Sequence, residues 1–144
     1  MYQIKETAEY YPLSVLFQNS GLEVKPSDTP PETARKLWRY DDDQGLAGAC
    51  QVGVRKGYWC LECLAVREDV RSGGIGKQML DLAEQEARDH GAREMWLTGK
   101  VPEYYEQYGW VRVAREEAPP ISKCLTCDQF NVDCFPSIMK KSFK

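Results

Sequence analysis

The sequence predicts a single α/β domain in which a mixed (α+β) central β-sheet is flanked by helices, and three observations carry this prediction. The chain has 144 residues, which fits one domain of about 150 residues. Its apolar fraction of 42% and its charged fraction of 28% are ordinary for a globular protein. Segments with strand and helix patterns alternate along the chain, and a strand–helix–strand order gives a right-handed crossover between parallel neighbours.

The first half of the chain predicts four strands and one helix. Tyr58–Val66 is the most apolar strand segment, and its unbroken Leu64–Val66 run is typical of a central strand that is buried on both faces. Asp41–Gly45 has the composition of a hairpin turn, and a second turn is expected at Lys56–Gly57. The predicted strands are Tyr2–Lys5, Lys36–Tyr40, Leu46–Val54 and Tyr58–Val66, and the predicted helix is Ala8–Phe17.

The second half contains the strongest helix pattern, over Ile75–His90. Glu84 and Arg88 are spaced to pair across one turn of its outer face, and Gly91 stands where a helix ends. Apolar residues at helical spacing form the predicted buried stripe, namely Ile75, Met79, Leu82, Ala83 and Ala87. The remaining predicted elements are strands over Glu94–Thr98, Trp110–Arg115 and Cys134–Phe143 and a short helix over Pro102–Tyr108.

Composition and charge exclude several classes of protein. The 19 basic and 22 acidic residues give a net charge of −3, so no excess of cations is present to neutralise nucleic-acid phosphates. No apolar run approaches the ~20 residues that span a bilayer, so we expect no membrane partner. The start of the chain, Met1–Glu6, lacks the basic-then-apolar order of a secretory signal. We therefore expect a cytoplasmic protein whose six cysteines are reduced by default.

A glycine-rich segment, Arg67–Lys77, joins the apolar strand to the long helix. Glycines let the backbone approach a ligand closely, and the start of the following helix offers N–H groups and a favourable dipole. This combination predicts a pyrophosphate-binding loop, with a glycine-rich turn that binds nothing as the alternative. A Walker loop is excluded because Arg71 stands at its first glycine position and Gln78 follows Lys77. The dinucleotide fingerprint is excluded because its third glycine would fall at Met79.

Two motifs in this region carry a family resemblance. Arg71–Gly76 matches the pattern Arg/Gln-x-x-Gly-x-Gly/Ala, and it lies between the strand end Leu64–Val66 and the long helix. Tyr104–Trp110 is similar to a Phe-Tyr-x-x-x-Gly-Phe stretch. With both motifs in this order, the segment Leu61–Val113 resembles the GNAT superfamily of N-acetyltransferases.

The resemblance implies the GNAT acyl-CoA N-acyltransferase fold and transfer of an acetyl group from acetyl-CoA to a primary amine, by direct attack in a ternary complex. It implies that the pantetheine arm pairs with the main chain of Leu64, Ala65 and Val66. A small-molecule or peptide amine is the expected acceptor, and a homodimer stays open. Backbone amides of the motif would hold the pyrophosphate, those of Arg71, Ser72, Gly73, Gly74, Ile75, Gly76 and Lys77.

The resemblance also implies candidate catalytic residues. Tyr105 stands where the family often has a tyrosine that acts as general acid. Some members use a glutamate at the place of Cys60, so Glu62, two residues further on, is the candidate base, with an ordinary strand glutamate as the alternative and Glu68 as an outside candidate. Thr98 replaces an asparagine that some members have. A catalytically impaired CoA-binding sensor or interaction module is therefore the rival function.

The cysteines form two groups. Cys60 and Cys63 lie about 10 Å apart in an extended strand and point to opposite faces, so they are expected to be packing thiols without a disulfide. The other group belongs to an insertion near residues 117–134 of the single domain (1–144). Zinc there would need a fourth ligand such as His90 or Asp128. Reduced thiols are favoured, and a disulfide or zinc stays open for Cys124, Cys127 and Cys134.

Acidic residues cluster at two places, Asp41–Asp43 and Glu116–Glu117. These clusters are expected to be a charged hairpin turn and a solvated strand end, with attraction of a cationic amine as the alternative.

Overall fold

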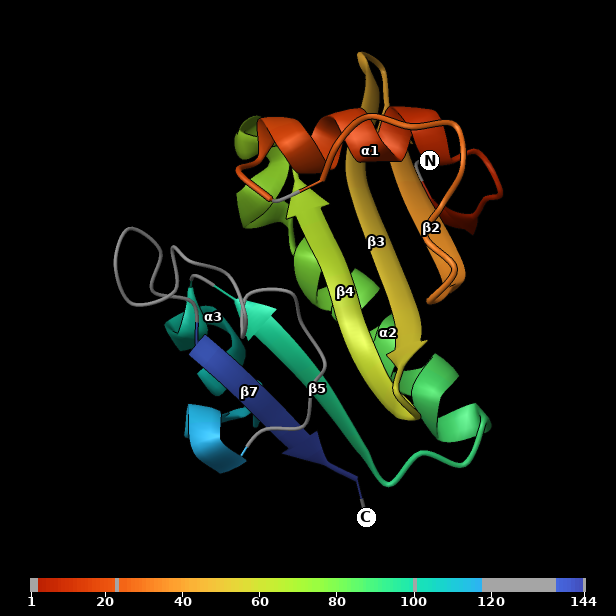
Figure 1. Ribbon diagram of the computed structural model, residues 1–144. Coiled ribbons are helices and arrows are strands. Elements are labelled where there is room, and N and C mark those ends of the chain that lie inside the picture. Colours follow the sequence, from red (N-terminus) through yellow and green to blue (C-terminus); the bar gives the residue numbers. More distant parts are fainter. Residues whose placement is uncertain (1–2, 23, 100, 118–136, 144) are drawn as a thin grey trace. The chain divides into compact units, whose positions relative to one another are not determined.

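The computed structural model describes residues 3–22, 24–99, 101–117 and 137–143, and in them the sheet runs β1-β2-β3-β4-β5-β7-β6 (Figure 1). β4 pairs in parallel with β5, while β7 is antiparallel to both β5 and β6. The predicted mixed sheet is therefore confirmed. The strands are β1 (Ile4–Glu6), β2 (Ala34–Asp42), β3 (Gly45–Arg55), β4 (Tyr58–Val66), β5 (Glu94–Gly99), β6 (Val111–Val113) and β7 (Ser137–Ser142). The helices are α1 (Tyr10–Asn19), α2 (Ile75–Asp89), α3 (Pro102–Glu106) and the 3₁₀ helices η1 (Glu68–Gly73) and η2 (Arg115–Glu117).

The boundaries differ from the prediction at a few places. α1 begins two residues later than expected, and β6 covers only the middle of the predicted Trp110–Arg115 strand. β2 and β3 are longer than predicted, so the hairpin turn shrinks to Asp43–Gln44. The segment that we expected to be an irregular loop contains the 3₁₀ helix η1.

The chain divides into two compact units. The first comprises Met1–Gly53 and Leu61–Glu86, and the second comprises Val54–Cys60 and Ala87–Lys144.

In the first unit, α1 packs on one face of the sheet. Its buried residues Tyr10, Leu13 and Phe17 form one cluster with Leu37 of β2, Ala49 of β3 and Ala65 of β4. α2 packs on the opposite face, because a Cβ built on the neighbouring Gly48 would lie 3.5 Å from Met79 of α2. The two helices therefore sandwich the sheet of this unit (Figure 1).

The buried stripe of α2 differs from the prediction at one position. Leu82 is 37% exposed, whereas Leu80 is fully buried. At about 100° per residue, Leu80 lies about 20° from the buried Ala87 around the helix, and Leu82 lies about 140° from it. Glu84 is buried rather than on an exposed outer face, so that part of the prediction was wrong.

The second unit has its own core. Cys60 of β4 pairs with Trp96 of β5, and both pack with Ile138 of β7. At the end of α2, the ring of His90 lies 5.2 Å from that of Trp59. Gly91 follows with a φ of 86° and ends the helix as predicted.

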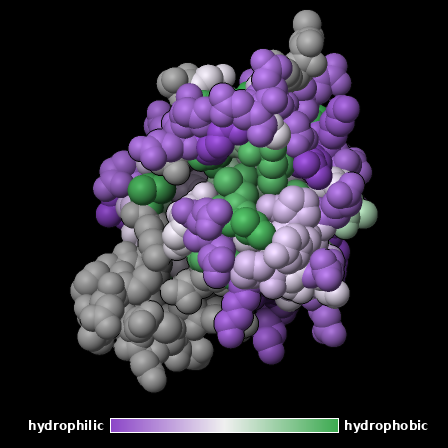
Figure 2. All heavy atoms as spheres, turned by 90° about the horizontal axis from the view of Figure 1, so that it is seen from above, coloured by the Kyte–Doolittle hydropathy of each residue, from purple (hydrophilic) through white to green (hydrophobic). Residues whose placement is uncertain are grey.

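Hydrophilic side chains cover most of the face that Figure 2 shows, and some apolar residues show through near its centre. Within the described ranges, no helix is long and apolar enough to cross a membrane.

Candidate active site

The loop between β4 and α2 has the backbone geometry of an anion site. η1 ends at Gly74, which has a φ of 80°, and α2 begins at the next residue. The N–H of Gln78 donates to the carbonyl oxygen of Gly74 at 3.1 Å, so the earlier N–H groups of α2 have no carbonyl one turn before them in the helix. A Cβ built on Gly73 or Gly74 would meet no atom within 4 Å. The side-chain positions of both glycines are therefore open.

The remaining predicted loop residues have distinct environments. Ile75 and Gly76 are buried at the start of α2, and the side chain of Lys77 pairs with Asp81 one turn further along. Arg71 and Ser72 lie within η1.

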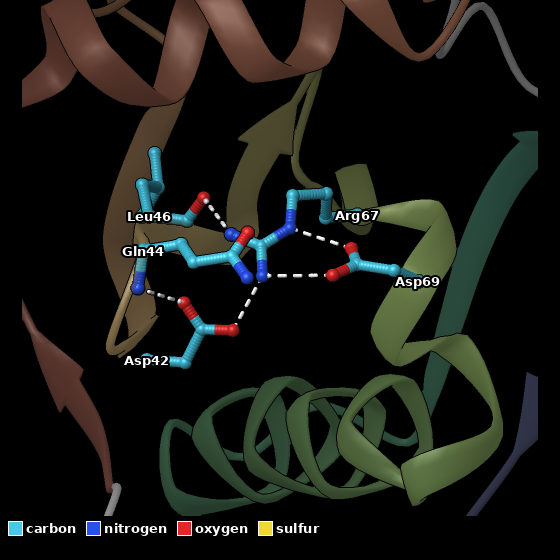
Figure 3. A network of polar contacts seen from close by, with 5 residues as sticks. All are labelled: Asp42, Gln44, Leu46, Arg67 and Asp69. Atoms are coloured by element: carbon cyan, nitrogen blue, oxygen red, sulfur yellow. Dashed lines mark hydrogen bonds and ion pairs between the residues drawn. The ribbon is translucent and has the colours of Figure 1, made fainter.

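The side chain of Arg67 fixes the start of this loop (Figure 3). Its Nε and Nη2 donate to the two carboxylate oxygens of Asp69 at 2.6 and 3.1 Å, and its Nη2 also donates to Asp42 at the tip of the β2–β3 hairpin. Its Nη1 donates to the carbonyl oxygen of Leu46 at 3.4 Å. We call Arg67, Asp42 and Asp69 the arginine clamp, since together they tie the hairpin to the loop.

The clamp also explains the first acidic cluster. Arg67 lowers the pKa of Asp42 and of Asp69 through hydrogen bonds to their carboxylates. Arg39 pairs with both oxygens of Asp41 at 2.8 and 2.9 Å and lowers its pKa in the same way. These pairs support the structural reading of the cluster over attraction of an amine.

The end of β4 leads directly into the loop. Ala65 is buried against α1, while Leu64 and Val66 are half-buried. The N–H of Arg67 donates to the carbonyl oxygen of Ala47 at 2.7 Å. The structure thus places the three predicted strand residues immediately before the anion loop.

Glu62 lies in a close-fitting polar cradle. Its Oε2 accepts a hydrogen bond of 2.6 Å from Thr33 Oγ1, and its Oε1 accepts one of 3.0 Å from Gln51 Nε2. A Cβ built on Gly53 would lie 2.2 Å from Glu62 Oε1, so only a glycine leaves room for the carboxylate. We call Thr33, Gln51 and Gly53 the carboxylate cradle; their role was not recognised in the sequence, where nothing in their spacing links them to Glu62.

Two further titratable groups lie near Glu62. Burial raises the pKa of Tyr10 on α1, and the charges of Cys63 and Glu62 raise it further. The phenol of Tyr10 therefore stays protonated beside the carboxylate at neutral pH.

Tyr105 belongs to the second unit and is held by other aromatic rings. It is 9% exposed, and its ring centroid lies 6.1 Å from that of Trp110 and 5.1 Å from that of Tyr104. A Cβ built on Gly99 would approach the Tyr105 ring to 3.3 Å. Tyr104 also contacts Tyr108 edge-on, so these aromatic rings pack against one another.

Thr98, at the end of β5, carries a buried hydroxyl with no hydrogen-bond partner among the residues described. A buried hydroxyl normally finds a partner, so this position suits a group that arrives with a ligand.

Cys60 and Cys63 both lie on the extended strand β4, as predicted. The parts of the chain that the structure describes contain no cluster of three His, Cys, Asp or Glu side chains able to hold a metal. Cys124, Cys127 and Cys134, and the zinc and disulfide alternatives for them, lie outside the described residues. Glu68 is exposed on η1.

A family model of the acetyltransferase (GNAT) domain matches residues 33–112, which is more than half of the chain and includes the loop, the cradle and Tyr105. The chain belongs to the GNAT acetyltransferase family. The sequence motifs suggested a resemblance over Leu61–Val113. The family model extends this match upstream, so that it also includes β2 and β3. This GNAT chain is 29% identical over 76 residues to the acetyltransferase Atu2258 of Agrobacterium fabrum, over 51% of its own length and 56% of that relative.

Solved structures share the fold of this GNAT chain. It superimposes with a TM-score of 0.78 on N-acetylglutamate synthase from Neisseria gonorrhoeae, complexed with coenzyme A and N-acetyl-glutamate, at 16% identity over 100% of this chain and 35% of that one. The TM-score is 0.68 for the ribosomal-protein-S18-alanine N-acetyltransferase from Escherichia coli, at 17% identity over 100% and 95% of the two chains. At these identities the likeness confirms the predicted GNAT acyl-CoA N-acyltransferase fold.

Proposed function

We propose that this GNAT chain transfers an acetyl group from acetyl-CoA to a primary amine by direct attack in a ternary complex. The anion loop is the observation that carries the proposal, because Gly74 in the left-handed region opens the start of α2 to a ligand. The synthase of the same fold was solved with coenzyme A, which supports a CoA-type donor.

The donor would lie along backbone that the structure presents at the end of β4 and in the loop. The amides of residues 71–77 would bind the pyrophosphate, because N–H groups at a helix start favour an anion. The main chain of Leu64, Ala65 and Val66 would pair with the pantetheine arm as an added strand does. The buried hydroxyl of Thr98 would gain its hydrogen-bond partner from the same arm.

Transfer removes two protons from the amine and gives one to the leaving thiolate. An alkylamine with a pKa near ~10.4 is mostly ammonium at neutral pH, so Glu62 would accept its first proton, directly or through water. The amine nitrogen then bonds to the thioester carbonyl carbon. As the tetrahedral intermediate collapses, the nitrogen releases its second proton to solvent and the carbon–sulfur bond breaks. Tyr105 would give its proton to the departing thiolate, because a phenol has comparable basicity. The products are an amide and CoA with a free thiol.

The acceptor is an amine of a small molecule or of a peptide. The two neighbours of the same fold are named for N-acetylglutamate and for a protein alanine, so α-amino groups are the first class to test. L-Glutamate, a peptide with an N-terminal alanine, spermidine and tyramine together represent amino-acid, peptide, polyamine and aromatic amines.

Release of free thiol from acetyl-CoA, measured for each of these amines, tests the proposal. We expect release above the hydrolysis background for at least one amine, and Tyr105→Phe should lower kcat far more than it weakens CoA binding. CoA binding without turnover on any amine would instead favour the sensor or interaction module. The residue at position 60 also favours this module, because the buried thiol of Cys60 stands where some family members have a glutamate. If the protein showed neither CoA binding nor turnover, both functions would be excluded.

A further inference from the structure

Gln51 is an unusual residue for the centre of β3. Its side chain is 1% exposed, in a strand whose neighbouring residues Cys50 and Val52 are fully buried and apolar. Its Nε2 donates to Glu62, but its Oε1 is buried without a hydrogen-bond partner in the described part of the chain. A buried carbonyl oxygen left without a partner is destabilising. An apolar side chain of the same size would avoid this cost. The favourable contribution of the Gln51 amide therefore has to come from its NH2 group.

The NH2 group of Gln51 donates a hydrogen bond to the Glu62 carboxylate. Thr33 Oγ1 donates to the second oxygen of the same carboxylate, and Gly53 leaves the room in which that carboxylate lies. Both donors are neutral, so they orient the carboxylate without neutralising its charge. The three cradle residues come from β3 and from the turn before β2, whereas Glu62 is on β4.

We infer that Gln51 is a positioning residue that holds the Glu62 carboxylate in one orientation. The inference rests on the proposed function only for the role of Glu62 as the base. Gln51 Nε2 and Thr33 Oγ1 each donate to a different oxygen of this carboxylate, so the loss of either donor frees the carboxylate group to rotate. A substitution of Gln51 leaves the hydrogen bond from Thr33 in place.

The test compares the wild type with Gln51→Met, which keeps the side-chain length and removes both amide groups. The carboxyl signal of Glu62 is recorded at neutral pH by NMR on protein with ¹³C-labelled glutamate carboxyls, and Glu62→Gln identifies this signal. We expect the signal in Gln51→Met to move toward the signals of exposed glutamates, because one of the two hydrogen-bond donors to the carboxylate is lost. We expect Tm to stay equal or to rise, since the unpartnered carbonyl oxygen is also removed. Gln18→Met is the matched control, since Gln18 is exposed on α1, and it should change neither quantity.

A Glu62 carboxyl signal in Gln51→Met that equals that of the wild type would overturn the inference. If Gln51→Met does not fold, the wild-type protein alone still tests the inference. The Nε2 amide group of Gln51 should show a through-hydrogen-bond NMR coupling to the Glu62 carboxyl carbon, and the absence of this coupling would overturn the proposal. Thiol release by Glu62→Gln separates the two claims. Full activity in that variant would refute the role of Glu62 as base, and it would leave the positioning measured by the carboxyl signal standing.

Discussion

Gly74 and Gly91 show how the same backbone conformation serves two different purposes. Both have a φ in the left-handed region, 80° and 86°, and a Cβ on either would meet no atom within 4 Å. Gly91 ends α2, whereas Gly74 stands before its first residue. Only Gly74 therefore lies where the proposed pyrophosphate would bind.

We expect Gly74→Glu to abolish CoA binding, because the new carboxylate would crowd and repel the pyrophosphate. Calorimetric titration of CoA into the variant measures the effect. Gly91→Glu is the matched control, since it introduces the same residue at a similar φ, and it should retain the affinity of the wild type. Both variants should lose about 1–2 kcal/mol of folding stability, the cost of a non-glycine residue in this region. Wild-type affinity in Gly74→Glu would show that the loop does not bind the donor.

Single residues also mark where the sequence could and could not predict the site. The turn at Gly73 and Gly74 was predictable because it is local: a glycine-rich segment directly before a helix is visible in the order of residues. The contacts of Gln51 and Gly53 with Glu62 depend on how β3 and β4 are aligned across the sheet, which no local pattern encodes. Cys60 and Cys63 are expected to remain unbridged because strand geometry alone decides that point.

At the scale of elements, the β4–loop–α2 segment follows the prediction most closely. β4 matches residue for residue, and α2 ends one residue before the predicted end. α1 was less well predicted because its N-cap residue, Glu9, makes no side-chain capping hydrogen bond, so the sequence contains no start signal of that kind. β6 was predicted too long because its length is set by the register with Ile138–Lys140 of β7.

The arginine clamp should control donor affinity through the loop. We expect Arg67→Leu to weaken CoA binding about tenfold, since η1 loses its link to the β2–β3 hairpin; a tenfold change is ~1.4 kcal/mol of binding free energy. Arg39→Leu is the control, because Arg39 pairs with Asp41 within the same strand, β2. Equal CoA affinity in the two variants would show that the clamp serves the fold alone.

The same variant predicts a change in acid stability. Because Arg67 lowers the pKa of Asp42 and Asp69, the clamp stabilises the fold fully above their unfolded pKa, near ~3.9. This contribution is lost as the pH falls through the lowered folded values. Arg67→Leu should therefore lose less stability than the wild type between about pH 5 and pH 2, as measured by urea denaturation at each pH. Parallel losses in both proteins would contradict the pairing.

At the scale of the whole molecule, the family domain that matches residues 33–112 includes residues of both compact units. The chain spans little more than half of the length of its curated relative. The fold class was predictable because the alternation of strands and helices and the two motifs are properties of the chain order. The acceptor was not, because nothing in the sequence specifies which amine reaches Glu62.

The proposed reaction can follow one of two routes: direct attack of the amine on acetyl-CoA, or transfer through an acetylated protein side chain. A double-displacement route would need a nucleophile that carries the acetyl group, and the thiols in the described ranges suit this poorly. Cys50 and Cys60 are buried in the two cores, and burial together with the charge of Cys63 raises the pKa of Cys50, which keeps the thiol protonated. We therefore expect initial rates at varied acetyl-CoA and amine to give intersecting double-reciprocal lines. Mass spectrometry after incubation with acetyl-CoA alone should show no acetylated protein. Parallel lines together with an acetyl group on a cysteine would replace direct attack by a covalent intermediate.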